Sequence, residues 1–199
     1  MASGNNLVIY GPPHLGKTVL LTQQLGTADF IYIGCRPGFK RAQIYRVLLS
    51  SLGYALLVEK KRRGKASTTV KFGIGSIGVE AGAEGEMEQM MQSVTIDLKN
   101  ASEVAHLISR IKRPPRVVLD NFQLLDRGTK ENLLFDLAFL SERRSIQVVI
   151  VGAWSQEDYL EEIEPAVAGR FRYIEISPWS NPELREAAAK SKAKAHRFE

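Results

Sequence analysis

Apolar runs alternate with amphipathic segments along most of this chain. Short apolar runs, which predict strands, occupy residues 7–10, 29–35, 94–98, 116–122, 147–154 and 171–179. Segments with helical spacing of apolar residues occupy 17–25, 42–53, 101–111, 129–143, 156–163 and 181–195. Continuously apolar strands that are separated by helices are typical of a parallel sheet with both faces covered. The pattern therefore predicts an α/β fold built on a mainly parallel sheet.

One segment interrupts this alternation with a different pattern. Residues 67–85 are rich in glycine, serine and threonine, yet apolar residues alternate along them at Val70, Phe72, Ile74, Ile77 and Val79. A linker would not alternate in this way, so we predict a glycine-rich β-hairpin inserted into the domain. The resulting division is a core over residues 1–180, an insertion over about 60–92, and a C-terminal helix over 181–199.

The first predicted strand and the first predicted helix are joined by "GPPHLGKT". This loop consists of Gly11, Pro12, Pro13, His14, Leu15, Gly16, Lys17 and Thr18. It is the phosphate-binding loop pattern, in the strand-to-helix context that confirms it. Glycines let backbone N–H groups face the phosphates, and the helix N-terminus adds its dipole. We predict that Lys17 reaches the β- and γ-phosphates, that it faces solvent when no nucleotide is bound, and that Thr18 offers its hydroxyl to Mg²⁺.

The apolar run at 116–122 contains the second polar element of this site. In an open parallel sheet, ligands bind at the carboxyl ends of the strands, where Asp120 is predicted to lie. We expect its carboxylate to accept a magnesium-bound water opposite Thr18; the alternative is that it caps the next turn. The following residue is Asn121, where P-loop ATPases of this style usually have an acid. An amide can orient a water but cannot take its proton, so nucleotide binding is predicted while hydrolysis stays open.

Composition and charge narrow the picture further. The 199 residues are 44% hydrophobic and 25% charged, which suits one α/β domain, and no apolar run reaches the ~18 residues of a membrane span. A single cysteine and the lack of a signal-peptide pattern lead us to expect a cytoplasmic protein. The net charge is +5, and a basic run contains Lys60, Lys61, Arg62 and Arg63. That run is either a solvated charge cluster or a contact to nucleic-acid phosphates.

The order of the motifs "GPPHLGKT", "VVLDN", "VVIVGAWS" and "AVAGRFRYIEISPWSNPEL" resembles that of the AAA+ superfamily. Within it, the chain is most similar to the STAND-like signalling ATPases and their relatives in bacterial defence and transposition. The resemblance covers roughly residues 5–185. It implies that Ser155, with Trp154 in reserve, senses the γ-phosphate. It also implies that Arg170, with Arg172 in reserve, is an arginine finger acting on a neighbouring subunit.

The same resemblance implies a helical lid after the core, so the chain is expected to be either a fragment or a minimal version. The predicted catalytic residues are then Lys17, Asp120, Asn121, Ser155 and Arg170. The leading hypothesis is a switch or assembly module that binds ATP or ADP with Mg²⁺, hydrolyses slowly if at all, and self-associates in response to nucleotide. The alternatives are a DNA-associated AAA+ ATPase that uses the basic insertion, and a non-hydrolysing interaction module stabilised by nucleotide.

Overall fold

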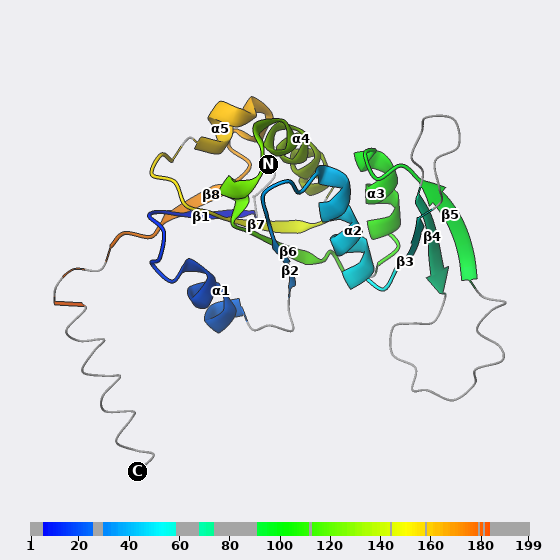
Figure 1. Cartoon of the computed structure of the whole chain (residues 1–199), viewed down its shortest axis with the longest axis horizontal. Helices are drawn as coiled ribbons and strands as arrows, with labels where there is room; N and C mark the ends of the chain where they lie inside the picture. Colours follow the sequence, from blue (N-terminus) through cyan, green and yellow to red (C-terminus); the bar gives the residue numbers. More distant parts are fainter. Residues whose placement is uncertain are drawn as a thin grey trace, which may run out of the picture.

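A five-stranded parallel sheet forms the centre of the protein (Figure 1). The computed structural model describes residues 6–25, 30–58, 68–73, 91–111, 113–143, 145–157, 159–178, 180 and 182–183. The strands of this sheet are β1 (Leu7–Tyr10), β2 (Ile31–Gly34), β6 (Arg116–Asp120), β7 (Gln147–Val151) and β8 (Arg172–Glu175). They lie in the order β2-β6-β7-β1-β8, and every pairing is parallel. The predicted parallel α/β sheet is confirmed.

Helices cover both faces of this sheet, as predicted. Figure 1 shows α1 (Lys17–Leu25) on one face. On the other face lie α2 (Arg41–Ser51), α3 (Ala101–Ile108), α4 (Arg127–Glu142) and α5 (Tyr159–Ile163). Successive strand residues point to opposite faces, so Val117 and Leu119 join the larger core under α2–α5, whereas Val118 joins a smaller cluster with Leu21 of α1. The strands are therefore buried on both faces, which explains their continuous hydrophobicity.

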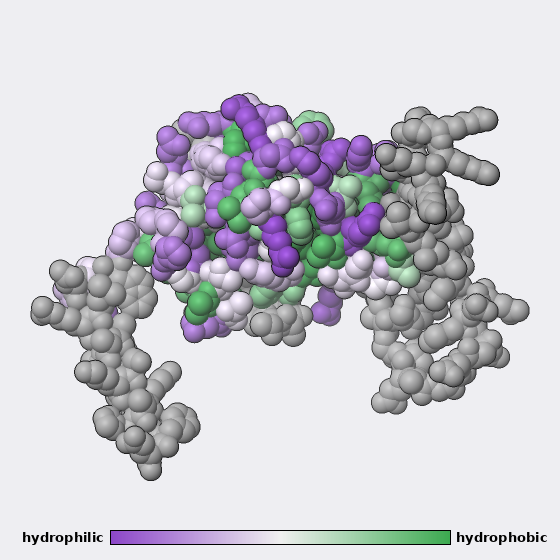
Figure 2. All heavy atoms as spheres, viewed as in Figure 1, coloured by the Kyte–Doolittle hydropathy of each residue, from purple (hydrophilic) through white to green (hydrophobic). Residues whose placement is uncertain are grey.

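The helix ends follow from local side-chain chemistry. Asn100 caps α3 by accepting a hydrogen bond from the Ser102 backbone N–H at 3.0 Å, and Asp126 caps α4 in the same way from Thr129 at 3.0 Å. Gly53 follows α2 with φ 86°, the left-handed conformation that ends many helices. Among the described residues, none of the helices is long and apolar enough to cross a membrane. Figure 2 shows hydrophobic residues scattered among hydrophilic ones on the face it draws.

A separate antiparallel sheet stands beside the core (Figure 1). Its strands are β3 (Ala55–Val58), β4 (Thr68–Gly73) and β5 (Met91–Ile96), with β4 in the middle. The predicted hairpin paired strands within 67–85. Instead, β4 pairs with strands on either side of that range, with Val70 opposite Leu56 and Val94. Residues 74–85, the second half of the predicted hairpin, lie outside the described residues.

Several predictions about the insertion and the C-terminus fall outside the described residues. Ile74, Ile77 and Val79 lie there, and so does the basic run with Lys60, Lys61, Arg62 and Arg63. The predicted helix over 181–195 lies outside them too, apart from residues 182–183. The domain boundaries and the contact between the basic run and nucleic acid therefore stay predictions.

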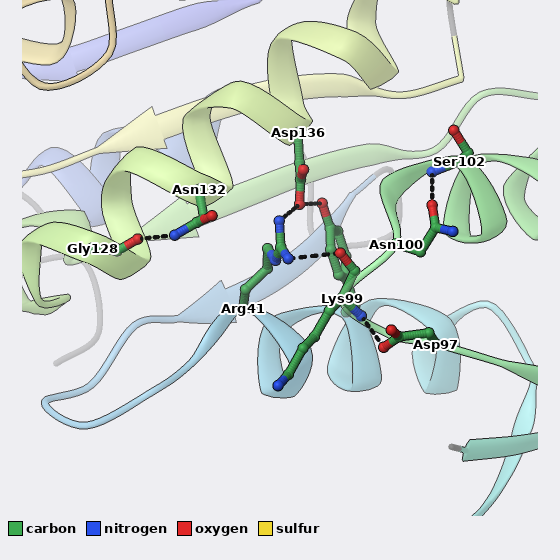
Figure 3. A network of polar contacts seen from close by, with 9 residues as sticks. Arg41, Asp97, Lys99, Asn100, Ser102, Gly128, Asn132 and Asp136 are labelled. Carbon is green, nitrogen blue, oxygen red and sulfur yellow. Dashed lines mark hydrogen bonds and ion pairs between the residues drawn. The ribbon is translucent and has the colours of Figure 1, made fainter. Parts of the chain in front are cut away.

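A network of polar contacts around the buried Asp136 ties the segment after the antiparallel sheet to the core (Figure 3). Arg41, at the start of α2, donates one hydrogen bond to Asp136 of α4 at 2.9 Å and another to the carbonyl of Lys99 at 2.6 Å. Lys99 lies between β5 and α3. The Tyr45 hydroxyl also donates to Asp136, at 2.8 Å. Burial raises the pKa of Asp136, while its bonds to Tyr45 and Arg41 oppose that rise. Arg41 thus joins α2 to α4 through Asp136 and to the segment after β5 through the Lys99 carbonyl.

Candidate nucleotide-binding site

The loop between β1 and α1 has the backbone that close approach to a ligand requires. Gly11 has φ 136°, and a Cβ at this residue would lie 2.2 Å from the carbonyl oxygen of Ile176, just after β8. Only glycine fits there. Gly16 has φ 75° immediately before α1, and His14 has φ 65° at the exposed tip of the loop. This bent loop leads directly into the helix N-terminus, where the first N–H groups have no intrahelical acceptor.

Lys17 lies inside the loop, so the expectation that it faces solvent is wrong. Its side chain is buried, and its Nζ donates hydrogen bonds to the carbonyls of Gly11 at 2.9 Å and Pro12 at 2.5 Å. Burial lowers the pKa of Lys17, and the nearby charge of Asp120 opposes that change. The loop carbonyls satisfy an ammonium that would otherwise be poorly solvated. The lysine thus holds the two ends of the loop together from within.

Thr18 and Asp120 come together at the carboxyl edge of the sheet, as the sequence predicted. Asp120 is the last residue of β6, and the residue is 3% exposed. The Thr18 hydroxyl donates to Asp120 Oδ2 at 2.7 Å. The Asn121 backbone N–H donates to Asp120 Oδ1 at 2.8 Å. A carboxylate and a hydroxyl therefore meet at the first turn of α1, beside the phosphate-binding loop.

Tyr32 is a third partner of this carboxylate, and sequence reasoning missed it. The residue lies on the edge strand β2, and its hydroxyl donates to Asp120 Oδ2 at 2.5 Å. Its ring is partly exposed, whereas the hydroxyl end is desolvated against Asp120. Desolvation, the hydrogen bond and the charge of Asp120 together raise the pKa of Tyr32, which keeps the hydroxyl protonated as a donor. One signal in the sequence could have indicated this contact. Tyr32 carries a hydroxyl and lies two residues before the end of β2, the strand that pairs with the strand of Asp120.

Asn121 adopts a left-handed conformation, with φ 58° and ψ 38°. Asparagine tolerates this region better than most residues. Its side chain is exposed next to Asp120, and a short 3-10 helix (Phe122–Leu124) follows it. Within that helix, Gln123 accepts a hydrogen bond from the Ala153 backbone N–H at 3.1 Å through its Oε1. Gln123 was also missed, and it fixes the loop after β7 beside the end of β6.

Ser155 lies in that loop after β7, at the same edge of the sheet as the phosphate-binding loop. It is exposed. The preceding Trp154 is packed in an aromatic stack, with ring centroids 6.3 Å from Tyr10 and 4.8 Å from Tyr159. Its ring also covers Gly152, where a Cβ would lie 1.8 Å from a ring carbon. The Trp154 ring is thus engaged in packing against Tyr10, Tyr159 and Gly152. The role of Ser155 in sensing the γ-phosphate stays a prediction.

The structure does not bring Arg170 together with the phosphate-binding loop. Arg170 comes two residues before Arg172, which pairs with Leu7 at the start of β1. It therefore lies near the amino-terminal edge of the sheet, opposite the loop that follows Tyr10. Its guanidinium forms an ion pair with Glu142, the last residue of α4. In this chain Arg170 cannot act on a nucleotide at its own loop, and its role as an arginine finger stays a prediction.

Comparison with known proteins identifies the family. The sequence matches the family model described as "AAA domain" over residues 2–160. The chain belongs to the AAA domain family. This AAA domain therefore has the nucleotide-binding P-loop ATPase fold that its motifs and sheet indicate. No curated protein matches its sequence.

Solved structures share the fold of this AAA domain at low sequence identity. One is Cdc6p from Pyrobaculum aerophilum, with a TM-score of 0.55 and 18% identity over 96% of this chain and 43% of that one. Another is the Orc1 protein of Aeropyrum pernix, in complex with DNA, with a TM-score of 0.51 and 17% identity over 95% of this chain and 44% of that one. The chain thus spans less than half the length of these two proteins.

The side chains at the loop fit a magnesium ion bound together with a nucleotide. Among the residues that the structure describes, no three His, Cys, Asp or Glu side chains gather to form an all-protein metal site. Mg²⁺ usually keeps several waters and takes only one or two protein groups plus substrate phosphates. The Thr18 hydroxyl and the Asp120 carboxylate are hard oxygen groups of this kind, and they are in contact.

Proposed function

We propose that this AAA domain is a nucleotide-dependent switch or assembly module that binds ATP or ADP with Mg²⁺ in the Gly11–Thr18 loop. The observation that carries the proposal is the placement of a buried lysine and a Thr–Asp pair around one helix N-terminus. The N-terminus of α1 attracts an anion through its dipole and free N–H groups. Lys17 adds a positive charge within the same loop. A polyphosphate is the ligand that this combination recognises.

Binding would require Lys17 to exchange its partners. Its Nζ now donates to the carbonyls of Gly11 and Pro12, and it would turn to the β- and γ-phosphate oxygens. Thr18 and Asp120 would hold the magnesium ion, Thr18 through its hydroxyl oxygen and Asp120 through metal-bound water. When bound, the magnesium ion would neutralise part of the negative charge of the phosphates. Without nucleotide the two loop carbonyls accept the hydrogen bonds of the Lys17 ammonium, and with nucleotide the phosphate oxygens would replace them.

Hydrolysis in this proposal is slow. The exposed side chain of Asn121 is beside Asp120, where it can hold a water by hydrogen bonding. An amide cannot accept the proton that leaves the attacking water, so a general-base contribution of about 10²–10⁴-fold is missing. A domain that binds tightly and turns over slowly stays in one nucleotide state for long periods, which suits a switch.

Assembly is the output that we propose for this switch. Arg170 lies at the sheet edge opposite the loop, so its guanidinium could approach phosphates only in another copy of the chain. The site would then be composite, with the finger supplied by a neighbour. For Arg170 to act in this way, its ion pair with Glu142 must open when the copies associate.

Isothermal titration calorimetry with ATP and ADP tests the binding step. We expect both nucleotides to bind in Mg²⁺ at one site per chain, and ATP to bind more weakly in EDTA. Lys17→Ala should lose this binding. Its matched control is Lys130→Ala, because Lys130 is as buried as Lys17 but donates to Tyr159 at 2.8 Å, away from the loop. Folded wild-type protein that binds neither nucleotide would contradict the proposal.

A second candidate is a DNA-associated ATPase. It is favoured by the net charge of +5 and by the basic run, which falls in the sequence between β3 and β4 of the antiparallel sheet. This candidate predicts DNA binding that weakens steeply with salt and strengthens with ATP. Replacement of Lys60, Lys61, Arg62 and Arg63 by alanine should then reduce affinity in a fluorescence anisotropy titration. Unchanged affinity in that variant would exclude this role for the run.

A further inference from the structure

Tyr32 reaches the carboxylate of Asp120 along an open path on the sheet surface. In the pairing of β2 with β6, Tyr32 lies opposite Val118, and Gly34 lies opposite Asp120. A Cβ at Gly34 would be 3.6 Å from a carbon of the Tyr32 ring, so the ring extends over this glycine. A methyl group at Gly34 would thus only touch the ring, so the phenol passes over this residue at van der Waals distance. The hydroxyl then meets the carboxylate two residues further along.

The hydrogen bonds to Asp120 leave little of its acceptor capacity free. An ionised carboxylate has about four lone-pair sites. The hydroxyls of Thr18 and Tyr32 both donate to Oδ2, and the Asn121 backbone N–H donates to Oδ1. These three donors, all from described residues, leave room for one further donor, on Oδ1. A water on a magnesium ion held by Thr18 would be such a donor.

We propose that Tyr32 is a positioning residue for magnesium, holding Asp120 so that its one free acceptor site faces a metal-bound water. This inference rests on the proposed binding of ATP with Mg²⁺. Tyr32 itself touches neither the metal nor the phosphates in this account. Its contribution is to occupy the second acceptor site of Oδ2 and to fix the rotation of the carboxylate. Partners of this kind, one step outside a metal site, typically change metal affinity by about 10–100-fold when removed.

The variant Tyr32→Phe tests the proposal, because it keeps the ring over Gly34 and removes only the hydroxyl. ATP affinity is measured by calorimetry across a series of Mg²⁺ concentrations and in EDTA. We expect the Mg²⁺ concentration needed for half of the affinity gain to rise about tenfold in the variant. Affinity for ATP in EDTA should equal that of the wild type. If Tyr32 had only a structural role, its replacement would change ATP affinity equally with Mg²⁺ and in EDTA.

Tyr45→Phe is the matched control. Tyr45 also donates its hydroxyl to an aspartate, Asp136, but in the network between α2 and α4. This variant should lower the melting temperature and leave the Mg²⁺ requirement unchanged. A wild-type Mg²⁺ requirement in Tyr32→Phe, or an equal loss of affinity with and without Mg²⁺, would overturn the proposal. Absence of ATP binding by the wild type would instead contradict the proposed function itself.

Discussion

Lys17→Ala is expected to destabilise the nucleotide-free protein as well as to remove its nucleotide affinity. The Lys17 ammonium donates to the carbonyls of Gly11 and Pro12, and hydrogen bonds to charged groups contribute about 1.5–3 kcal/mol each. Burial of the ammonium, which lowers the pKa of Lys17, offsets part of this. Pro12 is exposed and its carbonyl can regain water, whereas the Gly11 carbonyl is buried. We therefore expect a loss of about 1–2 kcal/mol.

Two assays follow from this estimate. For a domain of this size each kcal/mol lowers the melting temperature by about 2–4 °C, so thermal unfolding without nucleotide should shift down by roughly 2–8 °C. Two charged hydrogen bonds to phosphate correspond to at least about a 100-fold loss of ATP affinity in calorimetry. Lys130→Ala should lower the melting temperature and keep the affinity.

Two results would refute this reasoning. A Lys17→Ala variant that melts at the wild-type temperature would show that the lysine does not hold the loop together. A variant that keeps the wild-type ATP affinity would show that the lysine does not reach the phosphates. The first result would exclude the structural role of Lys17, and the second would exclude its role in nucleotide binding.

Three further predictions concern turnover, assembly and the buried network. Asn121→Glu should raise ATP turnover by about 10²-fold or more if the missing base limits hydrolysis; an unchanged rate in a phosphate-release assay would place the limit elsewhere. Arg170→Ala should abolish the rise of specific activity with protein concentration without changing ATP affinity, and a concentration-independent wild-type rate would contradict this. Asp136→Ala should cost about 3 kcal/mol, because it leaves Arg41 and Tyr45 without their acceptor. Since burial raises the pKa of Asp136 above 3.8, stability relative to Asp136→Asn should fall as pH rises from below 3.8 through that higher folded-state pKa, and a flat difference in chemical denaturation would contradict it.

The parallel sheet and the phosphate-binding loop were predictable because both are local patterns. Continuous apolar strands require burial on two faces, and "GPPHLGKT" has its strand before it and its helix after it. Asp120 followed from one topological rule, that strands of a parallel sheet end at a common edge. No contact between distant residues had to be known for these predictions.

The features that sequence reasoning missed depend on the pairing of distant segments. The role of Tyr32 requires the register of β2 against β6, which places Gly34 beside Asp120. The burial of Lys17 depends on how the loop folds back, which brings the carbonyls of Gly11 and Pro12 to its ammonium. The partners of β4 could not be read from the sequence, because alternation identifies a strand but not which other strand it pairs with.

The most direct test of the central claim is a crystal structure of the chain with Mg²⁺ and a non-hydrolysable ATP analogue. The account predicts the triphosphate at the N-terminus of α1, with Lys17 Nζ within about 3 Å of β- and γ-phosphate oxygens. The magnesium ion should contact the Thr18 hydroxyl and, through water, Asp120. A complex in which the nucleotide lies elsewhere, or in which Lys17 still donates to the carbonyls of Gly11 and Pro12, would contradict the account.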